Sequence, residues 1–553
     1  MARTYDDSMF RDTFEHEYTW LNGFMRNVRR FSKRPAIIDP DTDRSWNYKQ
    51  LNIEANRLAN ALKNLGIKKD DVVMGALRNS PEFAFMYTGP RKIGAIFLAA
   101  NFNLASGEMA LLINHNKPKV VVYSANVAKM MEEAAAICLW KPSLFIMADN
   151  IEGVDLPKGH VSYEDFVENS SVDEPKIDFR PHIYDEVLRL CTSGTTSLPK
   201  FVPVNDINEV LSAHDVIMHY PMNPHDVTLN MTPWFHRGGC HSGGVCPVLY
   251  AGAAAVIMRS FRPQTSLDWC SKYKITFMMG APANLEMLTR AQEKSPRDIS
   301  SLRGIVTMGA PLSRTDCIRF RTVLTENIFN GYGTTETFWN SFLRPYNLPD
   351  GAGSVGGSCT DDEVRVVRLP ADGSKAEPDD LVPTDSETEG EIIIHSPAKS
   401  TYSYYRNDEM TKEKFYKGWM YTGDTGVWNE DWVVTVKGRK DDMMVVSGEN
   451  IYPAQIEEAI MENEKVKDCI VTSVPDKVRG QSVCAYVIAD DPSLTVKELN
   501  EFCAESKMLS KYKRPRYFAI VEKIPLTATG KKQHSKIKAQ AEKDLDDGIL
   551  VRV

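Results

Sequence analysis

Hydrophobic positions recur along this chain with helical and strand spacings that alternate over most of its length. Between residues 48 and 65, leucine and alanine return every three or four positions, and Gly66 follows the last of them. This spacing predicts an amphipathic helix that ends at the glycine. Continuous apolar runs at 71–77 and 119–123 predict buried strands. We therefore expect the region from about 19 to 126 to mix strands and helices.

The alternation is clearest between residues 187 and 331. Strands are predicted at 187–191, 253–258, 275–279, 304–308 and 327–330, and helices at 265–273, 283–292 and 314–323. Alternating strands and helices are typical of a layered α/β domain with a mainly parallel sheet. Such sheets bind ligands beyond the carboxyl ends of their strands. We therefore expect binding residues in the loops after Cys191, Met308 and Asn330.

The pattern changes after residue 351. Short apolar runs at 364–368 and 391–395 flank a polar loop that contains proline, which predicts a β-rich part from about 351 to 438. The charged residues 439–442 indicate a linker. From 443 to 553, a helix start at Pro453 and further strands and helices predict a compact α+β domain.

Composition narrows the class of protein. The chain has 553 residues, of which 42% are hydrophobic and 25% charged, and a formal net charge of -8, which argues against nucleic acid as a partner. Its ten cysteines contain no Cys-x-x-Cys pair, which favours reduced thiols. No signal-peptide pattern is present, and the apolar stretch 245–258 is too short to span a membrane. We expect a cytoplasmic protein without an integral membrane segment, and a homodimer is left open.

A run of glycine and hydroxyl residues follows the strand predicted at 187–191. It consists of Thr192, Ser193, Gly194, Thr195 and Thr196, and Lys200 follows shortly after. Short side chains let backbone N–H groups approach a polyphosphate, hydroxyls add donors, and the lysine supplies positive charge. The spacing is not that of a Walker A motif. Taken alone, the run fits a Ser/Thr-rich surface loop equally well.

Two later loops carry groups suited to a nucleotide. Gly309, Ala310 and Pro311 are small enough for a flat group to lie against the backbone. The second loop contains Asn330, Gly331, Tyr332, Gly333, Thr334, Thr335 and Glu336. Its amide and aromatic ring can hold a purine, and its carboxylate can bind Mg²⁺. A glycine-rich turn with a helix-capping Thr and Glu is the alternative.

Two single residues complete the candidate chemistry. Asp424 follows a short turn-like segment and can accept both hydroxyls of a ribose, although a lone Asp in a turn also forms an Asx turn. Lys531 stands in a Gly/Thr-rich loop from which its ammonium can reach beyond its own domain, or it is simply an exposed lysine.

Taken together and in this order, these segments resemble the adenylate-forming superfamily of acyl-CoA synthetases, firefly luciferase and peptide-synthetase adenylation domains. The matching segments are 192–200, 233–236, 330–336, 421–424, 438–442, 447–453 and 525–531, and the resemblance extends from about 19 to 538. No carrier-protein segment follows residue 538, which favours the acyl-CoA synthetase branch.

The resemblance implies an α/β fold with a large N-terminal domain (1–438, including the β-rich part 351–438), a hinge (439–442) and a small mobile α+β C-terminal domain (443–553). It also implies a two-step reaction. A carboxylate attacks the α-phosphate of ATP to give an acyl-adenylate and pyrophosphate, and the thiol of coenzyme A then displaces AMP. The cofactors implied are ATP, Mg²⁺ and coenzyme A as a co-substrate.

The resemblance also implies residue roles by matching position. Thr192, Ser193, Gly194, Thr195, Thr196 and Lys200 would grip the β- and γ-phosphates. Gly309, Ala310, Pro311, Asn330, Gly331, Tyr332, Gly333 and Thr334 would line the adenine side of the site. Thr335 would bind the α-phosphate, Glu336 the magnesium, and Asp424 with Arg439 the ribose. Lys531 would bridge the carboxylate and the α-phosphate, Asp441 would be the hinge residue, and Ser447, Gly448, Glu449 and Asn450 would line the coenzyme A tunnel.

The acyl pocket implied by the resemblance is apolar. Its residues would be His236, Cys240, His241, Met279, Ala281, Met308, Phe338 and Trp339, with His236 acting as a gate toward the adenylate. Aromatic and thioether walls favour an aromatic, alicyclic or medium-chain acid. The alternatives are a longer-chain fatty acyl-CoA synthetase, a non-catalytic nucleotide-binding homologue and a luciferase-type oxygenase.

Three positions depart from the pattern of the superfamily. Ser197 and Phe201 stand where glycine is usual, and Asp206 where histidine is common. Serine disfavours the positive φ that glycine tolerates, and phenylalanine adds bulk. We therefore expect a stiffer or differently shaped phosphate loop and weaker or slower handling of ATP.

Overall fold

The structure is a computed structural model that describes residues 6–192, 199–370, 372–446, 449–476, 480–506, 509, 513–526 and 531–553. The chain divides into two compact units. The first contains residues 1–352, 358–363 and 394–420, and the second contains 353–357, 364–393 and 421–553. No helix among the described residues is long and apolar enough to cross a membrane.

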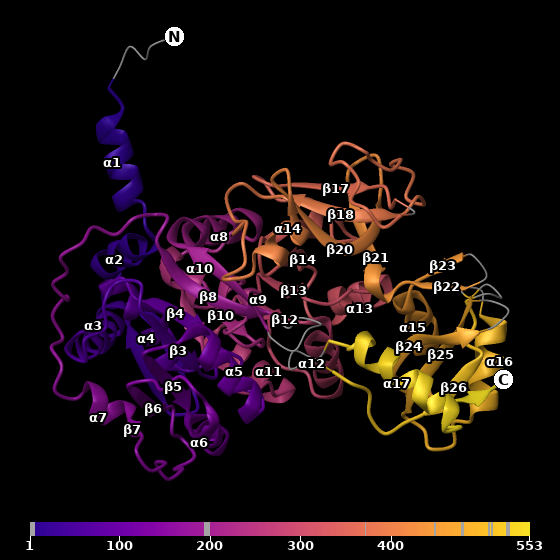
Figure 1. Ribbon diagram of the computed structural model, residues 1–553, viewed down its shortest axis with the longest axis horizontal. Helices are drawn as coiled ribbons and strands as arrows, with labels where there is room; N and C mark the ends of the chain where they lie inside the picture. The colour runs from indigo at the N-terminus through magenta and orange to yellow at the C-terminus, as the bar shows by residue number, and fades with distance from the viewer. Residues whose placement is uncertain are drawn as a thin grey trace. The chain divides into compact units, whose positions relative to one another are not determined.

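The first unit contains two sheets (Figure 1). The seven-stranded sheet has the order β7-β6-β5-β3-β4-β8-β9, and the nine-stranded sheet has the order β16-β15-β14-β13-β12-β10-β11-β1-β2. The first sheet consists of β3 (Val72–Ala76), β4 (Ile96–Ala99), β5 (Val120–Ser124), β6 (Leu144–Ala148), β7 (Val161–Ser162), β8 (Glu186–Thr192) and β9 (Lys200–Asn205). The second consists of β1 (Pro35–Asp39), β2 (Arg44–Asn47), β10 (Val227–Asn230), β11 (Ala254–Val256), β12 (Phe277–Gly280), β13 (Gly304–Met308), β14 (Ile328–Thr334), β15 (Phe338–Leu343) and β16 (Gly357–Ser358).

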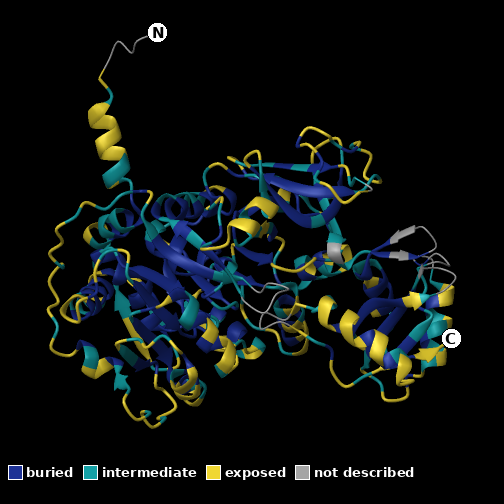
Figure 2. Ribbon diagram, in the orientation of Figure 1, coloured by how far each residue is buried: buried dark blue, intermediate teal, exposed yellow. Residues whose placement is uncertain are grey.

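Helices cover both sheets and fill the space between them. They are α1 (Ser8–Glu17), α2 (Trp20–Arg30), α3 (Tyr48–Asn64), α4 (Pro81–Thr88), α5 (Ser106–Asn116), α6 (Ala128–Ile137), α7 (Tyr163–Val167), α8 (Asp206–His219), α9 (Arg237–His241), α10 (Val245–Ala251), α11 (Pro263–Tyr273), α12 (Pro282–Lys294), α13 (Arg314–Val323) and α14 (Asp408–Lys414). One apolar core lies between the two sheets, a second under α5 and α6, and a third under α11 to α13. In Figure 2 the inner strands of both sheets are buried, whereas α1 has no buried residue. The result is a layered α/β unit.

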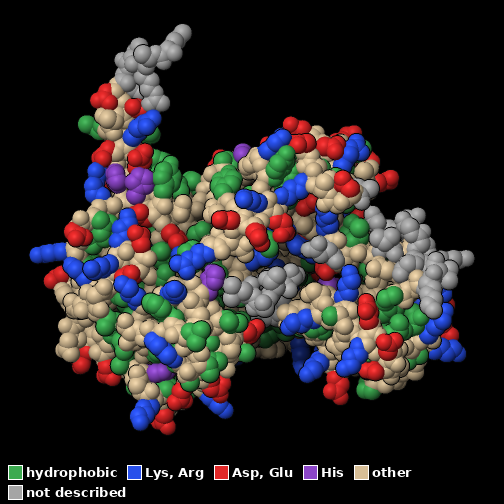
Figure 3. Space-filling view, viewed as in Figure 1, with side chains coloured by type: hydrophobic (Ala, Val, Ile, Leu, Met, Phe, Trp, Pro, Cys, Tyr) green, Lys and Arg blue, Asp and Glu red, His purple; other side chains and the backbone are tan. Residues whose placement is uncertain are grey.

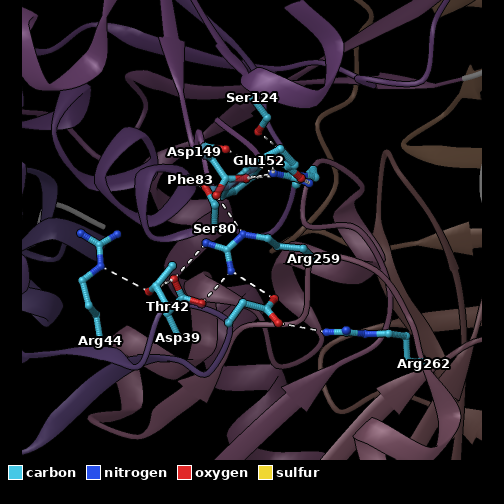
Figure 4. Close-up of polar contacts among 12 residues, drawn as sticks. Asp39, Thr42, Arg44, Ser80, Phe83, Ser124, Asp149, Glu152, Arg259 and Arg262 are labelled. Carbon is cyan, nitrogen blue, oxygen red and sulfur yellow. Dashed lines mark hydrogen bonds and ion pairs between the residues drawn. The ribbon is translucent and has the colours of Figure 1, made fainter. Parts of the chain in front are cut away.

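A buried ion-pair network joins the carboxyl ends of strands from both sheets (Figure 4). Arg259, which follows β11, donates to Asp39 at the end of β1 (Nη1 to Oδ1, 2.6 Å) and to Asp149, which follows β6 (Nε to Oδ1, 2.8 Å). Arg78, after β3, donates to the same Asp149 (Nε to Oδ2, 2.9 Å). Each buried charge of the network has an oppositely charged partner. The network therefore connects the ends of the two sheets without leaving an uncompensated ion.

The second unit contains most of a β-rich sheet and a separate α+β part. In the sheet, β18 (Gly390–His395) lies between β17 (Glu363–Val367) and β20 (Trp419–Trp428), β20 also pairs with β21 (Val434–Arg439), and β19 (Phe415–Tyr416) continues the order beyond β20. The remaining elements are β22 (Met444–Val446), β23 (Glu449–Ile451), α15 (Pro453–Met461), β24 (Val466–Asp476), β25 (Gly480–Ala489), α16 (Val496–Glu505), β26 (Tyr517–Ile520), α17 (His534–Asp546) and β27 (Val551–Arg552). On the face shown in Figure 3, acidic and basic side chains are interspersed.

The predicted fold class is confirmed, with three local corrections. The strand predicted at 187–191 lies in a different sheet from the four that follow it, because alternation alone does not say which strands pair. The segment after Asn330 is not a loop, since β14 continues to Thr334 and pairs with β15. Asp424 lies within β20, and the turn-like segment expected before it is part of the same strand. The domain boundary at 439–442 stays a prediction.

Candidate functional site

The two ends of the predicted phosphate loop lie on adjacent strands. β8 and β9 pair antiparallel, and Thr192 at the end of β8 is opposite Lys200 at the start of β9. Ser193, Gly194, Thr195, Thr196 and Ser197 lie outside the described residues, so their predicted roles stay predictions. Phe201 and Asp206, which also depart from the pattern of the superfamily, are both described. Phe201 is buried and stacks on His115 with ring centroids 4.9 Å apart. Buried Asp206 accepts the Trp20 backbone N–H at 2.5 Å.

Tyr404 lies between the two charged residues that the sequence assigns to phosphate and metal. Its hydroxyl donates to Glu336 Oε1 at 2.5 Å, and Lys200 Nζ lies 5.8 Å from the centroid of its ring. The next residue, Tyr405, donates its backbone N–H to the carbonyl of Phe201 at 2.8 Å. One side chain of the first unit therefore contacts both Lys200 and Glu336, although these residues belong to segments of different sheets. Sequence analysis missed Tyr404, and a cluster of tyrosines at 402–405 was the available signal.

The environment of Glu336 fits a divalent cation. The residue is 6% exposed, Tyr404 occupies one carboxylate oxygen, and the other accepts no hydrogen bond from the part of the chain that the structure describes. Magnesium prefers hard oxygen ligands, usually one or two carboxylates together with phosphate oxygens and water. A buried carboxylate with one oxygen fixed and one available matches that preference.

The hairpin of β14 and β15 positions the residues around Glu336. Asn330 is buried and lies opposite Thr307 of β13 in the parallel register, and Tyr332 is partly exposed. A Cβ atom at Gly333 would lie 1.6 Å from the Phe338 carbonyl oxygen, so only glycine fits there. Phe338 itself adopts φ +61°, an uncommon conformation of the kind that concentrates at functional sites.

The neighbouring loops add exposed and hydroxyl positions. Gly309, Ala310 and Pro311 are exposed after β13, and Gly309 has φ +83°, which favours glycine. Gly331 packs against the indole of Trp339, where a Cβ would come within 2.8 Å of Nε1. Thr334 and Thr337 are joined by a hydrogen bond between their hydroxyls at 3.0 Å. These positions bring small and hydroxyl side chains to the end of the nine-stranded sheet.

The predicted acyl-pocket residues lie where α9 faces the ends of β12, β13 and β15. His236 precedes α9 and packs against Phe235, with ring centroids 4.2 Å apart. The sulfur of Met308 accepts the Ser242 hydroxyl at 3.0 Å, and Met279 fills the space beside Gly243. The other predicted residues are buried or partly buried: Cys240, Ala281, Phe338 and Trp339. The methionines therefore occupy space between the strands and α9, but a pocket role for these residues stays a prediction.

His241, also predicted for the pocket, is bonded on both ring nitrogens. Nε2 faces the Glu209 carboxylate and Nδ1 lies 3.1 Å from the Arg237 carbonyl. Glu209 also accepts from Tyr87 and Arg91, and all four side chains are buried. Burial lowers the pKa of His241, although the charge of Glu209 opposes that shift. His241 is thus part of a packed polar network of the core.

Arg237 is a further charged residue of this region that sequence analysis missed. It is 2% exposed, and its Nη1 donates to the carbonyl of Thr335 at 2.7 Å. The signal was a cation directly after His236, in a run of otherwise small and apolar residues.

The second unit brings three predicted residues together. Asp424 on β20 lies opposite Arg439 on β21, and Arg439 Nη1 donates to Asp424 Oδ1 at 2.8 Å. Lys531 is exposed at the surface. The pKa of its ammonium is lowered overall, chiefly by desolvation; the carboxylate of Asp424 opposes this shift and the guanidinium of Arg439 adds to it. The predicted ribose ligands and the predicted catalytic lysine are therefore electrostatic neighbours.

The predicted hinge lies in a short 3-10 turn, Lys440–Asp442, directly after β21. Lys440 Nζ contacts Glu391 Oε2 at 3.3 Å, which holds the start of the turn to β18. Of the predicted tunnel residues, Ser447 and Gly448 lie outside the described residues. Glu449 and Asn450 belong to β23, which pairs with β22.

Close to the hinge, His534 forms a partly buried charge cluster. Its Nε2 lies 2.7 Å from Glu457 Oε1, its Nδ1 lies 3.9 Å from Asp442 Oδ2, and Lys532 Nζ lies 3.1 Å from Glu457 Oε2. Desolvation and the charge of Lys532 lower the pKa of His534. The hydrogen bond and charge of Glu457, together with the charge of Asp442, outweigh them, so the pKa of His534 is raised overall.

We expect this cluster to make the second unit more stable at acidic than at alkaline pH. Because the folded-state pKa of His534 is raised, its stabilisation is complete below the unfolded pKa of about 6.5 and is lost as pH rises through the folded value. His534→Gln should lower the Tm of the second unit by about 2–4 °C at pH 5.5 and by less at pH 8.5. Calorimetry at both pH values checks this, and an equal loss at both would contradict it.

Comparison with known proteins adds family information. A family model described as "AMP-binding enzyme" matches residues 24–405, and one described as "AMP-binding enzyme C-terminal domain" matches residues 455–531. The chain is 28% identical to a long-chain-fatty-acid–CoA ligase of Mycobacterium tuberculosis, over 90% of this chain and 93% of the relative. It is 26% identical to 4-coumarate–CoA ligase 1 of Solanum tuberosum, over 93% and 92%.

Solved structures agree on the fold. A crystal structure of an anthranilate CoA ligase in complex with anthranoyl-AMP superposes with a TM-score of 0.84 at 24% identity, and covers 96% of this chain and 98% of that one. The arrangement of layered sheets followed by a smaller α+β part is therefore shared with it.

Proposed function

The chain belongs to the AMP-binding enzyme family, and we propose that it is an AMP-forming acid:CoA ligase, which joins a carboxylic acid to coenzyme A with conversion of ATP to AMP and pyrophosphate. The observation that carries the proposal is the contact of Tyr404 with both Lys200 and Glu336. The match of the family models along most of the chain, and the ligase activity named for both relatives, support the same reaction class.

In the first half-reaction, the acid attacks the α-phosphate and pyrophosphate leaves. A carboxylate is a poor electrophile, and the adenylate gives it a good leaving group. Lys200 and the 192–196 segment would hold the β- and γ-phosphates, and Asn330 and Tyr332 the adenine. Glu336 would hold magnesium, which when bound neutralises phosphate charge. Positioning and charge neutralisation account for most of the catalysis in such a site.

Three residues of the second unit have proposed roles in the same half-reaction. Asp424 with Arg439 would bind the ribose hydroxyls, and Lys531 would neutralise charge between the carboxylate and the α-phosphate. A lysine suits this role because its ammonium is a compact charge on a flexible stem. In the second half-reaction, the thiol of coenzyme A attacks the acyl carbon and AMP leaves. Rotation about Asp441 would withdraw Lys531 and bring residues 447–450 to the coenzyme A tunnel.

The acid is proposed to be compact and apolar: aromatic, alicyclic or of medium chain length. Met279 and Met308 beside α9, and the aromatic side chains of Phe235 and Phe338, favour such a group. A longer fatty acid is the second candidate, favoured by the named substrate of the mycobacterial relative. His236 would close the pocket toward the adenylate.

A screen of pyrophosphate release tests the proposal. Wild-type protein with Mg²⁺ and ATP is given a panel of benzoates, cyclohexane carboxylates and straight-chain acids, with and without coenzyme A. We expect release that depends on the acid, acyl-CoA only when coenzyme A is present, and activity that falls with chain length. ATP binding without release on any acid would instead support a non-catalytic nucleotide-binding protein.

Replacement of Asp441 by proline should separate the two half-reactions. Proline fixes φ near −65°, which restricts rotation at the hinge. We expect adenylate formation within a few fold of wild type and thioester formation slowed by about tenfold or more, measured in single-turnover assays. Asp441→Ala, which leaves the backbone free, is the matched control. Thioester formation at the wild-type rate in the proline variant would contradict the hinge role.

A further inference from the structure

Arg237 has an unusual environment for a buried cation. No carboxylate of the described residues lies within ion-pair distance of its guanidinium, and its Nε has no hydrogen-bond partner among them. Its donors go mainly to backbone carbonyls: Nη1 to Thr335 O at 2.7 Å and Nη2 to Lys399 O at 3.1 Å, with a longer contact from Nη2 to Ser212 Oγ at 3.4 Å.

Stability alone does not account for this placement. Burial of a guanidinium without a direct counter-ion is unfavourable. Desolvation lowers the pKa of Arg237 to about 10, although the negative charges of Glu209 and Glu336 act to raise it. Other buried arginines of this chain are ion-paired: Arg91 with Glu209, and Arg259 with Asp39 and Asp149. An orphaned buried donor calls for a separate explanation.

Of the two carbonyls that Arg237 binds, one directly precedes Glu336 and the other belongs to a segment that contacts Glu336. Arg237 binds the Thr335 carbonyl, and the N–H of Thr401 donates to the Glu336 carbonyl at 3.0 Å. Lys399, the other backbone partner of Arg237, is two residues before Thr401, and Tyr404 of the same segment binds the Glu336 carboxylate. Arg237 therefore links the start of α9, the end of the β14 strand and the segment 399–404.

We propose that Arg237 is a positioning residue of adenylate formation. Through the Thr335 carbonyl it fixes the backbone that carries Glu336, and it holds this backbone relative to the adjacent His236, which is proposed for the acyl pocket. The inference rests on the proposed function. Arg237 touches neither substrate nor metal itself. It fixes the positions of Thr335 and Glu336 for the binding of magnesium and ATP. In the absence of magnesium, its positive charge partly compensates the charge of the buried Glu336 carboxylate.

Variants of Arg237 that separate donors from charge test this role. Arg237→Met removes both at similar volume, Arg237→Gln keeps amide donors, and Arg237→Lys keeps the charge. For Arg237→Met we expect adenylate formation to fall about 10²-fold, the size of effect that a misplaced catalytic group produces. The Mg²⁺ concentration at half-saturation should rise at least tenfold, and thioester formation from supplied acyl-adenylate should stay within a few fold. Arg237→Lys should restore part of the loss.

Calorimetric titration of Mg²⁺ and ATP without acid gives a readout that does not depend on turnover, and Arg237→Met should bind at least tenfold more weakly. Arg259→Met is the control, since it removes another buried arginine, one that belongs to the ion-pair network of Figure 4. It should lower the Tm but not the Mg²⁺ response. If Arg237→Met also lowers only the Tm, or slows both half-reactions equally, the positioning role is wrong. If wild type binds Mg²⁺ and ATP but releases no pyrophosphate on any acid, the proposed function fails, while the binding comparison still decides the role of Arg237.

Discussion

Replacement of Lys531 by alanine should lower the rate of acyl-adenylate formation by about 10²–10³-fold, the loss typical when one charge-stabilising group is removed from a transition state. Thioester formation from supplied acyl-adenylate should stay largely intact, because the proposed role of the ammonium ends when pyrophosphate leaves. The electrostatic coupling of Lys531 with Asp424 and Arg439 is the structural basis of this expectation. Pyrophosphate release and single-turnover thioester formation, assayed separately, measure the two effects.

A second lysine of the same region provides the control. Lys523 is exposed on the same unit, and Lys523→Ala should leave both half-reactions unchanged. If Lys531→Ala reduces both half-reactions to the same extent, Lys531 has no special role in the first. Equal binding of AMP by wild type and variant would show that the nucleotide site is still formed.

Replacement of Glu336 by glutamine should produce the other large loss. Glutamine keeps the shape and can still accept the Tyr404 hydroxyl, but it removes the charge proposed to hold magnesium. We expect adenylate formation to fall about 10²-fold or more, with a higher Mg²⁺ concentration at half-saturation. Titration of pyrophosphate release with Mg²⁺ and direct calorimetry of Mg²⁺ and ATP binding check both parts.

Tyr404→Phe separates the hydrogen bond from the charge. It removes the donor to Glu336 but leaves the ring beside Lys200, so we expect a smaller loss of about tenfold, the effect of one hydrogen bond to a charged group. If the tyrosine variant were as impaired as Glu336→Gln, the carboxylate charge would not be the main contribution. A Glu336→Gln variant with normal Mg²⁺ dependence would exclude the metal role.

Local patterns predicted the elements well. The strand at 304–308 and the helix at 314–323 match β13 and α13 in the structure, because their apolar spacing is unambiguous. The pairing of strands was not predictable, because 187–191 reads like its successors although it lies in another sheet. The turn-like segment expected before Asp424 belongs instead to β20, because cross-strand pairing continues through Asp424.

Candidate site residues could be proposed from the sequence only where a residue's chemistry is visible in its own segment. Glu336 and Lys200 stand in recognisable runs, whereas Tyr404 and Arg237 contact partners far away in sequence. A tyrosine or arginine outside a motif gives no local sign of the carboxylate or carbonyl that it will meet. Their contacts arise from how the segment 399–404 packs against α9 and the hairpin.

The division of the first unit into two sheets has a consequence for any attempt to dissect the protein. Lys200 begins a strand of one sheet, and Glu336 follows a strand of the other. A fragment cut in the connection between α8 and β10 would keep the lysine and lose the carboxylate, together with Tyr404. Neither piece alone would hold both charges, so recovered nucleotide binding on mixing two such pieces would report reassembly of the whole first unit.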